Sequence, residues 1–214
     1  METLREARRV AFERAGIPPD GGDSEPWVDF KLGPLPMPFP NTDARRRAVK
    51  LHDLHHVLTG YRTDILGEFE ISAWEIAAGC GRFPVAWLLN LMGLTAGLVV
   101  APRRIVRAFT RGAHSRALYT TLGFDAVIDE PVEAVRQRLG ISAADARLPL
   151  TAKVLGQLLA AALAGLSLGV VVLAVILTPV TLLVWVLTYS RYRSEKRRAF
   201  QQAAAPPRPF RVQP

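Results

Sequence analysis

Residues 52–68 read HDLHHVLTGYRTDILGE, and this stretch decides the fold because it predicts two helices joined by a tight reversal. Asn41 or Thr42 can cap the N-terminus of the first helix with a side-chain oxygen. Gly60 can end that helix, since glycine readily adopts the left-handed conformation found at helix C-termini. The first helix is therefore predicted to run from the cap to Gly60.

The predicted first helix has two unlike faces. At about 100° per residue, His56 lies about 40° and Asp53 about 100° from His52, so the three side chains share one side. His55 lies at the edge of that side and is the weakest candidate ligand. The opposite side carries the apolar residues that we expect to pack into the domain: Leu51, Leu54 and Leu58.

The second helix is predicted to start at Thr63 or Asp64 and to end near Gly79. The reversal between the helices turns Glu68 toward the histidines. Gly67 costs the helix about 1 kcal/mol relative to alanine, a cost that is easier to understand if the two helices approach closely.

These residues predict a metal site between two adjacent helices. Two imidazoles at positions i and i+4 can share one cation, and His52 and His56 have that spacing. Asp53 and Glu68 would complete the ligands, and Glu75 could transfer a proton. The alternative is a surface helix rich in histidine, with the glutamates as solvated charges.

The predicted ligands, two nitrogens and two carboxylates, suit a divalent metal. Zinc is favoured, and iron(II) or manganese would also fit. Cys80 is the only cysteine, which excludes an intrachain disulfide and a zinc site built on cysteines.

Residues 154–190 form a run of 37 residues without a charge. One helix of this length would measure about 55 Å, whereas the ~30 Å core of a bilayer needs ~20 residues. The run is too long for one straight span and too short for two. We expect either a tilted transmembrane helix or a transmembrane or re-entrant helical hairpin, bent or packed at Pro179, Gly165 and Gly169. A buried hairpin in a soluble protein is the alternative.

Basic residues flank this run, with Lys153 before it and a cluster beginning at Arg191 after it. In a hairpin both flanks would face the cytoplasm, which places the metal domain on the cytoplasmic side of a membrane. The formal net charge of +8, together with the apolar run, favours anionic lipid over nucleic acid as a partner.

The predicted fold class is all-α. Residues 1–41 are expected to form an N-terminal helix and a Pro-rich extended segment, and residues 42–150 a helical metal- and lipid-binding domain. Residues 151–198 are the predicted membrane segment with its basic flank, and residues 199–214 a disordered tail.

The pattern His-Asp-x-x-His, followed after eleven residues by Glu68, resembles the metal motif of the coenzyme Q biosynthesis protein 4 family. The resemblance extends through residues 107–141, RAFTRGAHSRALYTTLGFDAVIDEPVEAVRQRLGI, and covers roughly residues 34–141. It implies an all-helical protein, peripheral to membranes, with metal ligands at His52, Asp53, His56 and Glu68.

The resemblance also implies a role in ubiquinone biosynthesis. The family is associated with replacing the ring C1 carboxyl by hydroxyl, with holding a prenyl-type lipid in an apolar channel, and with organising other quinone-biosynthesis enzymes. The uncharged residues 83–102 would be a natural wall for the tail, with lipid contacts predicted at Leu88, Leu91, Met92 and Leu94. The apolar run 154–190 departs from the family, so only the domain-level role carries over.

Three other functions fit parts of the pattern. A phosphohydrolase of the HD type would need a further histidine upstream of His52, and the chain has none. A membrane metalloprotease would need glutamate as its base where this chain has the shorter Asp53. A non-catalytic, lipid-binding scaffold would use the same residues as the enzyme.

Overall fold

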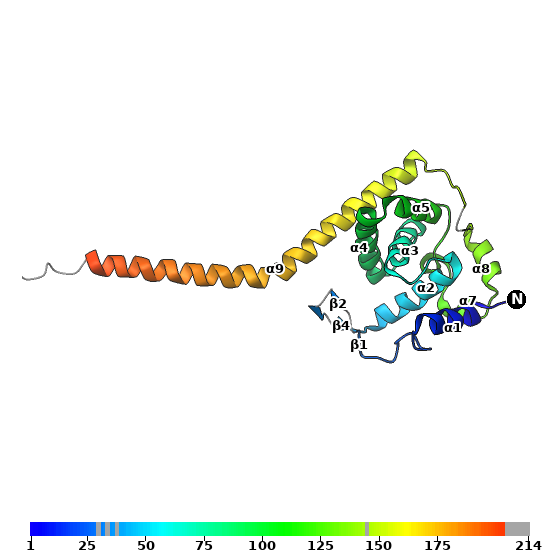
Figure 1. Ribbon diagram of the computed structural model, residues 1–214, viewed down its shortest axis with the longest axis horizontal. Coiled ribbons are helices and arrows are strands. Elements are labelled where there is room, and N and C mark those ends of the chain that lie inside the picture. Colours follow the sequence, from blue (N-terminus) through cyan, green and yellow to red (C-terminus); the bar gives the residue numbers. More distant parts are fainter. Residues whose placement is uncertain (29–30, 33–34, 37–38, 144–145, 204–214) are drawn as a thin grey trace, which may run out of the picture. The chain divides into compact units, whose positions relative to one another are not determined.

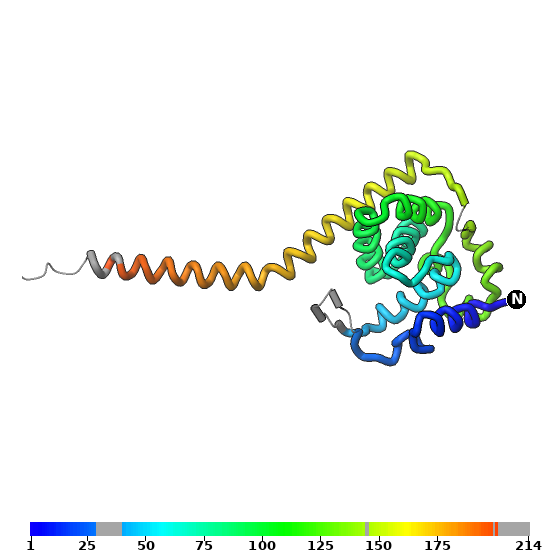
Figure 2. Tube along the Cα trace, viewed as in Figure 1, coloured from blue at the N-terminus to red at the C-terminus, as the bar shows by residue number. Residues whose placement is uncertain are grey.

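The computed structural model describes residues 1–28, 31–32, 35–36, 39–143 and 146–203 (Figures 1 and 2). The described part is mainly helical, as predicted. It divides into two compact units, residues 1–169 and residues 170–214. The first unit contains all of the predicted metal ligands.

The N-terminal segment forms a helix followed by short strand pairs. Helix α1 (Leu4–Ala15) begins with a capping box between Thr3 and Glu6 and ends at Gly16 in the left-handed conformation. In the Pro-rich segment, β1 (Trp27–Val28) pairs antiparallel with β4 (Phe39–Pro40), and β2 (Lys31–Leu32) with β3 (Leu35–Pro36). The segment is extended, as expected, but the strand pairing was not predicted.

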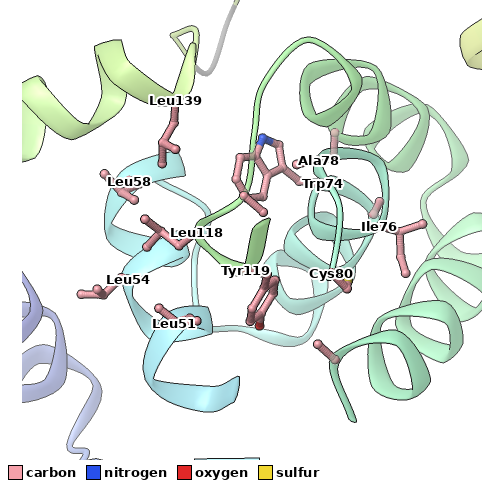
Figure 3. Close-up of a cluster of buried hydrophobic side chains, with 14 of the residues drawn as sticks. Leu51, Leu54, Leu58, Trp74, Ile76, Ala78, Cys80, Leu118, Tyr119 and Leu139 are labelled. Atoms are coloured by element: carbon pink, nitrogen blue, oxygen red, sulfur yellow. The ribbon is translucent and has the colours of Figure 1, made fainter. Parts of the chain in front are cut away.

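Helices α2 (Asp43–Thr59) and α3 (Ile65–Ala78) have the predicted boundaries. Thr42 caps α2 and Asp64 caps α3, while Gly60 ends α2 with a positive φ of 75°. The leucine side of α2 is buried, and Figure 3 shows its side chains grouped near Leu118 and Trp74: Leu51, Leu54 and Leu58.

Gly67 is needed for a different contact from the one predicted. A Cβ at this position would lie 1.9 Å from the carbonyl oxygen of Arg62, in the loop that joins α2 to α3. The glycine therefore allows the loop to fold back on the first turn of α3, whereas the prediction was a close approach of two helices.

The C-terminal end of α2 is held by two arginines from distant segments. Arg136 donates from Nε to the carbonyl of Leu58 (2.8 Å) and from Nη2 to that of Val57 (3.0 Å). The buried Arg111 donates to the carbonyl of Thr59 at 2.8 Å. Carbonyls at a helix end lack intrahelical partners, so these cations satisfy them and stabilise the end that carries His56.

Within the domain, α3 lies among α2, α4 (Pro84–Val100) and α5 (Pro102–Ala113) (Figure 1). It contacts all three. The short helices α6 (Leu118–Thr121), α7 (Phe124–Val127) and α8 (Val132–Leu139) follow, and each buries one or two apolar residues in the same core.

Helix α9 (Ala152–Ala203) is continuous through Pro179, so the predicted hairpin is wrong. A single proline removes one hydrogen bond and can be accommodated, whereas a reversal needs a turn that this run of apolar residues does not contain. Gly165 packs against α4, where an added Cβ would lie 2.5 Å from the Leu91 carbonyl oxygen, and nothing lies within 4 Å of such a Cβ at Gly169. Among the described residues, α9 is the one helix long and apolar enough to cross a membrane.

Candidate metal centre

Three predicted ligands converge between α2 and α3. His52 and His56 lie one turn apart on α2, and their Nε2 atoms are 3.2 Å from each other. Glu68, in the first turn of α3, places one carboxylate oxygen 3.3 Å from His52 Nε2 and the other 3.2 Å from His56 Nε2. One candidate ligand atom from each residue lies within 4.8 Å of the others, so the three could hold one ion.

The outer ring nitrogens determine the tautomers. His56 Nδ1 lies 3.0 Å from the carbonyl oxygen of Tyr61, which can only accept, so Nδ1 donates. His52 Nδ1 likewise donates to the carboxylate of Glu75 at 3.0 Å. Both Nε2 lone pairs then point at each other and at the carboxylate of Glu68. Such an arrangement needs a positive charge at its centre, either a metal ion or a proton.

The pKa of His52 also indicates that a positive charge is favoured at this position. Burial by itself would lower the pKa of His52, but the charge of Glu75 and the hydrogen bond to Glu68 outweigh it and hold the pKa well above its ordinary value. For Glu68, burial would raise the pKa, but hydrogen bonds from His52 and His56 lower it to about 2. A metal ion at this position would therefore compete with a proton.

His55 belongs to the core rather than to the ligand group. Its side chain is fully buried, its Nε2 accepts the backbone N–H of Leu118 at 2.9 Å, and its Nδ1 donates to Glu75 at 2.6 Å. Burial holds its pKa below the ordinary value. Both ring nitrogens are used, so His55 is a neutral structural residue, in agreement with its low rank as a candidate ligand.

Glu75 is fully buried and accepts hydrogen bonds from four side chains, those of His52, His55, Asn90 and Tyr119. Burial would raise its pKa, but the charge of His52 and the hydrogen bonds from both histidines hold it well below the usual range. A carboxylate with this many donors is a poor proton acceptor. The geometry favours an orienting role over the predicted proton transfer.

Asp53 does not join the convergent group. Its Oδ2 lies 3.3 Å from a guanidinium nitrogen of Arg8 on α1, and both side chains are mostly buried. Burial raises the pKa of Asp53, although His52 and Arg8 act in the opposite direction. The structure therefore brings three of the four predicted ligands together and directs the fourth to Arg8.

A cavity of about 300 Å³ opens beside the group. His52, Glu68 and Glu75 lie on its polar side, and Arg45 and Tyr119 also line it. Its apolar lining comes from α2 and α4: Ala48, Val49, Val85, Ala86 and Leu89. A larger cavity, of about 630 Å³ between α1, α2 and α8, includes only His56 of the three ligands, so the smaller one is the better candidate for a substrate.

The predicted lipid contacts on α4 do not line the smaller cavity. Leu94 is fully buried in the core, Leu91 lies where α9 crosses, and Leu88 and Met92 are exposed. Arg45 was not predicted as a site residue, although it lies seven residues before His52 on the same side of α2. Tyr119 carried no local signal, because only the packing of α6 brings it to Glu75.

A comparison with the sequences of known protein families matches residues 44–145 to the family described as "Coenzyme Q (ubiquinone) biosynthesis protein Coq4". No curated protein and no solved structure matched the chain. The matched residues cover all of α2 except Asp43, the helices α3 to α8 and all of the convergent ligands, while α1 and α9 lie outside them. This match over residues 44–145 supports assignment of the helical domain to the Coq4 family, and that family implies involvement in ubiquinone biosynthesis.

Proposed function

We propose that this protein is a metal-dependent enzyme of ubiquinone biosynthesis that replaces the ring C1 carboxyl of a polyprenylated benzoate by hydroxyl. The observation that carries the proposal is the convergence of His52 Nε2, His56 Nε2 and the Glu68 carboxylate beside a cavity with one polar and one apolar side. The substrate has the same two-sided character, with an anionic head group and an apolar ring and tail.

The donor set fits a divalent metal. Two imidazoles and a carboxylate suit zinc, which we favour, as well as iron(II) and manganese. When bound, the metal would fix the carboxylate of the substrate and polarise the oxygens on its ring. Replacing carboxyl by hydroxyl releases carbon dioxide and is a two-electron oxidation of the ring. It balances with dioxygen as second substrate when dioxygen is reduced to hydrogen peroxide and water supplies the hydroxyl oxygen.

The residues of the chain hold this site in place. Glu75 and the carbonyl of Tyr61 orient His52 and His56 through their Nδ1 atoms. Arg45 supplies a cation to the cavity, where an anionic head group would lie, and Val85 and Leu89 supply apolar surface for the ring and the start of the tail. Glu75 is assigned an orienting role in this proposal.

Membrane association is the second part of the proposal. Helix α9 suits one membrane span, and its basic flank suits anionic lipid head groups. A single span puts its flanks on opposite sides, so the predicted cytoplasmic position of the metal domain, which followed from a hairpin, loses its basis. Membrane-impermeant thiol probes at Ala152→Cys and Ser194→Cys, with Cys80 replaced, should label from opposite sides. Labelling from one side would contradict a single span.

Two other functions make different predictions. A metalloprotease would need a free base at Asp53, and the ion pair with Arg8 argues against that role. A non-catalytic scaffold that binds prenyl lipid and recruits other quinone-biosynthesis enzymes would use the same cavity without turnover.

The test is to incubate the purified full-length chain with metal, dioxygen and a polyprenylated hydroxybenzoate, and to follow loss of the carboxyl by mass spectrometry. We expect hydroxylated product from the wild type and from His114→Ala, whose histidine is exposed and outside the site. We expect none from His52→Ala. Substrate binding without product, with equal binding by His52→Ala, would contradict the enzyme and support the scaffold.

A further inference from the structure

Helix α4 keeps one apolar side exposed. A first side is buried in the core through Ala86, Asn90 and Leu94. A second side contacts the first part of α9, because an added Cβ at Gly165 would lie 2.5 Å from the Leu91 carbonyl oxygen (Figure 1). The third side covers roughly 120° of the helix at about 100° per residue, and we call it the outer stripe. Its members are exposed, or in one case partly exposed: Val85, Leu88, Leu89, Met92, Val99 and Val100.

The outer stripe is a contiguous apolar patch, and patches of this kind mark interaction surfaces, whereas single exposed apolar residues need no explanation. The stripe runs along nearly all of α4, and no residue from 83 to 102 carries a charge. Exposed arginines, Arg82 and Arg103, stand at the two ends of this uncharged stretch. Apolar residues framed by arginines suit the interface of a membrane that contains anionic lipids.

The chain enters its candidate membrane span a short distance after it leaves α4. Gly165 contacts α4, and the exposed unit of the chain begins at Val170. The five residues between these positions measure about 7.5 Å of helix, which matches the ~5–8 Å thickness of the head-group layer on one side of a bilayer. A bilayer around residues 170–190 would therefore reach α4. The first part of α9 also turns leucines outward at helical spacing: Leu155, Leu159, Leu163 and Leu166.

The cavity beside the candidate metal ligands opens through the outer stripe. Val85 and Leu89 line the cavity and are members of the stripe as well. The side chain of Leu89 is half exposed, so the cavity reaches the molecular surface at this point. A substrate with an anionic head and an apolar tail would therefore pass the stripe first and reach the polar side of the cavity last.

We propose that the outer stripe of α4 is embedded in the interface of an anionic bilayer, and that the cavity takes its amphipathic substrate sideways from the membrane. The inference rests on the membrane association and the substrate class proposed above. The physical reason is the unfavourable exposure of apolar surface to water. Sideways entry keeps the tail of the substrate in an apolar medium, and embedding removes the stripe itself from water.

Spin labels on the full-length chain test the embedding in vesicles of phosphatidylcholine and phosphatidylglycerol. With Cys80 replaced, labels are attached at Met92→Cys and Val99→Cys, and at Glu133→Cys on α8 as the exposed control. Oxygen concentrates among the acyl chains, whereas a nickel chelate stays in water. We expect the relaxation of both stripe labels to respond more strongly to oxygen than to the chelate, and the control label to show the reverse order.

A charge placed in the stripe tests sideways entry. Val99 lies near the end of α4, away from Val85 and Leu89 at the cavity. Val99→Asp should lower turnover of a long-tailed hydroxybenzoate in vesicles by about tenfold, because a charge on a lipid-facing helix is unfavourable. It should leave turnover of a short-tailed, water-soluble analogue unchanged. Val99→Leu keeps the apolar surface and should retain both activities. Equal loss with both substrates would contradict sideways entry.

Stripe labels that are as open to the nickel chelate as the control label would overturn the inference, because the stripe would then lie in water. Shielding from both reagents would also overturn it, since protein would cover the stripe. Spectral broadening that unlabelled chain removes would identify a second copy as that cover. The labels report without any turnover, so embedded labels in an inactive protein would contradict only the proposed reaction.

Discussion

The sequence of the helix pair α2–α3 predicts which side chains face the core, whereas the sequence of helix α9 does not. In α2 polar and apolar residues alternate with the helical period, so two sides were predicted. The leucine side is buried, and on the other side His52 and His56 lie close to Glu68. In α9 the apolar residues surround the whole helix, so no side was predicted to face protein. A patterned helix specifies its orientation, whereas a uniform one specifies only that its surroundings are apolar.

The structure divides the uniform run into two parts. Residues 154–169 belong to the domain unit and bury one stripe that includes Val154, Leu158 and Gly165. Residues 170–190 belong to the other unit, and none of their side chains is buried. This second part would be about 31 Å long, the thickness of a bilayer core. The run was too long for one span because its first part packs on protein.

The largest expected effect tests the ligand side of α2. His52→Ala should remove most of the metal, because the two ligands that remain would hold an ion poorly, while His114→Ala should retain it. Metal content per chain after dialysis is the measurement. Equal metal content in the two variants would mean that the polar side of α2 is a solvated surface and holds no metal. The pattern of α2 would then predict only which side of the helix is buried.

A substitution on the leucine side of α2 should change the stability of the fold rather than metal binding. Leu54→Ala should lower the free energy of unfolding by about 2–5 kcal/mol, the usual cost of a cavity at a fully buried leucine. Urea unfolding measures this change. The folded fraction should bind metal normally, and a change near zero would show that this side is not the core.

His55→Ala should behave like a core variant although it changes a histidine. It leaves the Leu118 N–H unsatisfied and removes one donor from Glu75, so we expect a loss of about 1–3 kcal/mol in unfolding free energy. Metal affinity should fall by no more than about tenfold, as for a change outside the ligand shell. Metal loss equal to that of His52→Ala would instead make His55 a ligand.

In α9, two glycines offer a matched comparison. Gly165→Leu should displace residues 154–169 from α4, because its Cβ would lie 2.1 Å from Thr95 Oγ1, and we expect a cost of about 1–3 kcal/mol. Gly169→Leu should have little effect, since nothing lies within 4 Å of its Cβ. Hydrogen exchange of α4 amides and urea unfolding would measure both. Equal changes in unfolding free energy and in exchange for the two variants would mean that residues 154–169 do not pack on α4 more closely than the residues that follow.

The smallest expected effect is on pH dependence. The pKa of His52 is raised in the fold, so its contribution to metal-free stability is full below about pH 6.5 and is lost as the pH rises through the folded pKa. The pKa of Glu68 is lowered to about 2 in the fold. Its contribution to stability is therefore complete above the ordinary pKa of a glutamate and is lost as the pH falls toward 2. Stabilisation by added metal should therefore increase with pH. Thermal melts with and without metal measure it, and a pH-independent difference would exclude competition between metal and proton.

The candidate site was predictable where the signals are local. The spacing of His52 and His56 and the turn that brings back Glu68 are properties of neighbouring residues. Glu75 was found, but its role was not, because its donors Asn90 and Tyr119 come from other helices. Asp53 was placed on the correct side of α2, yet its partner Arg8 lies 45 residues away in the chain.

The sequence by itself determined the helix ends, the two sides of α2, the histidine pair and the apolar character of α9. These properties depend on contacts within a few residues, on helical periodicity and on composition. Only the tertiary structure decided that Asp53 faces Arg8, that His55 is a core residue and that α9 packs on α4 before it becomes fully exposed. Each of these depends on which distant side chain or backbone atom occupies the neighbouring space, and local spacing carries no information about that.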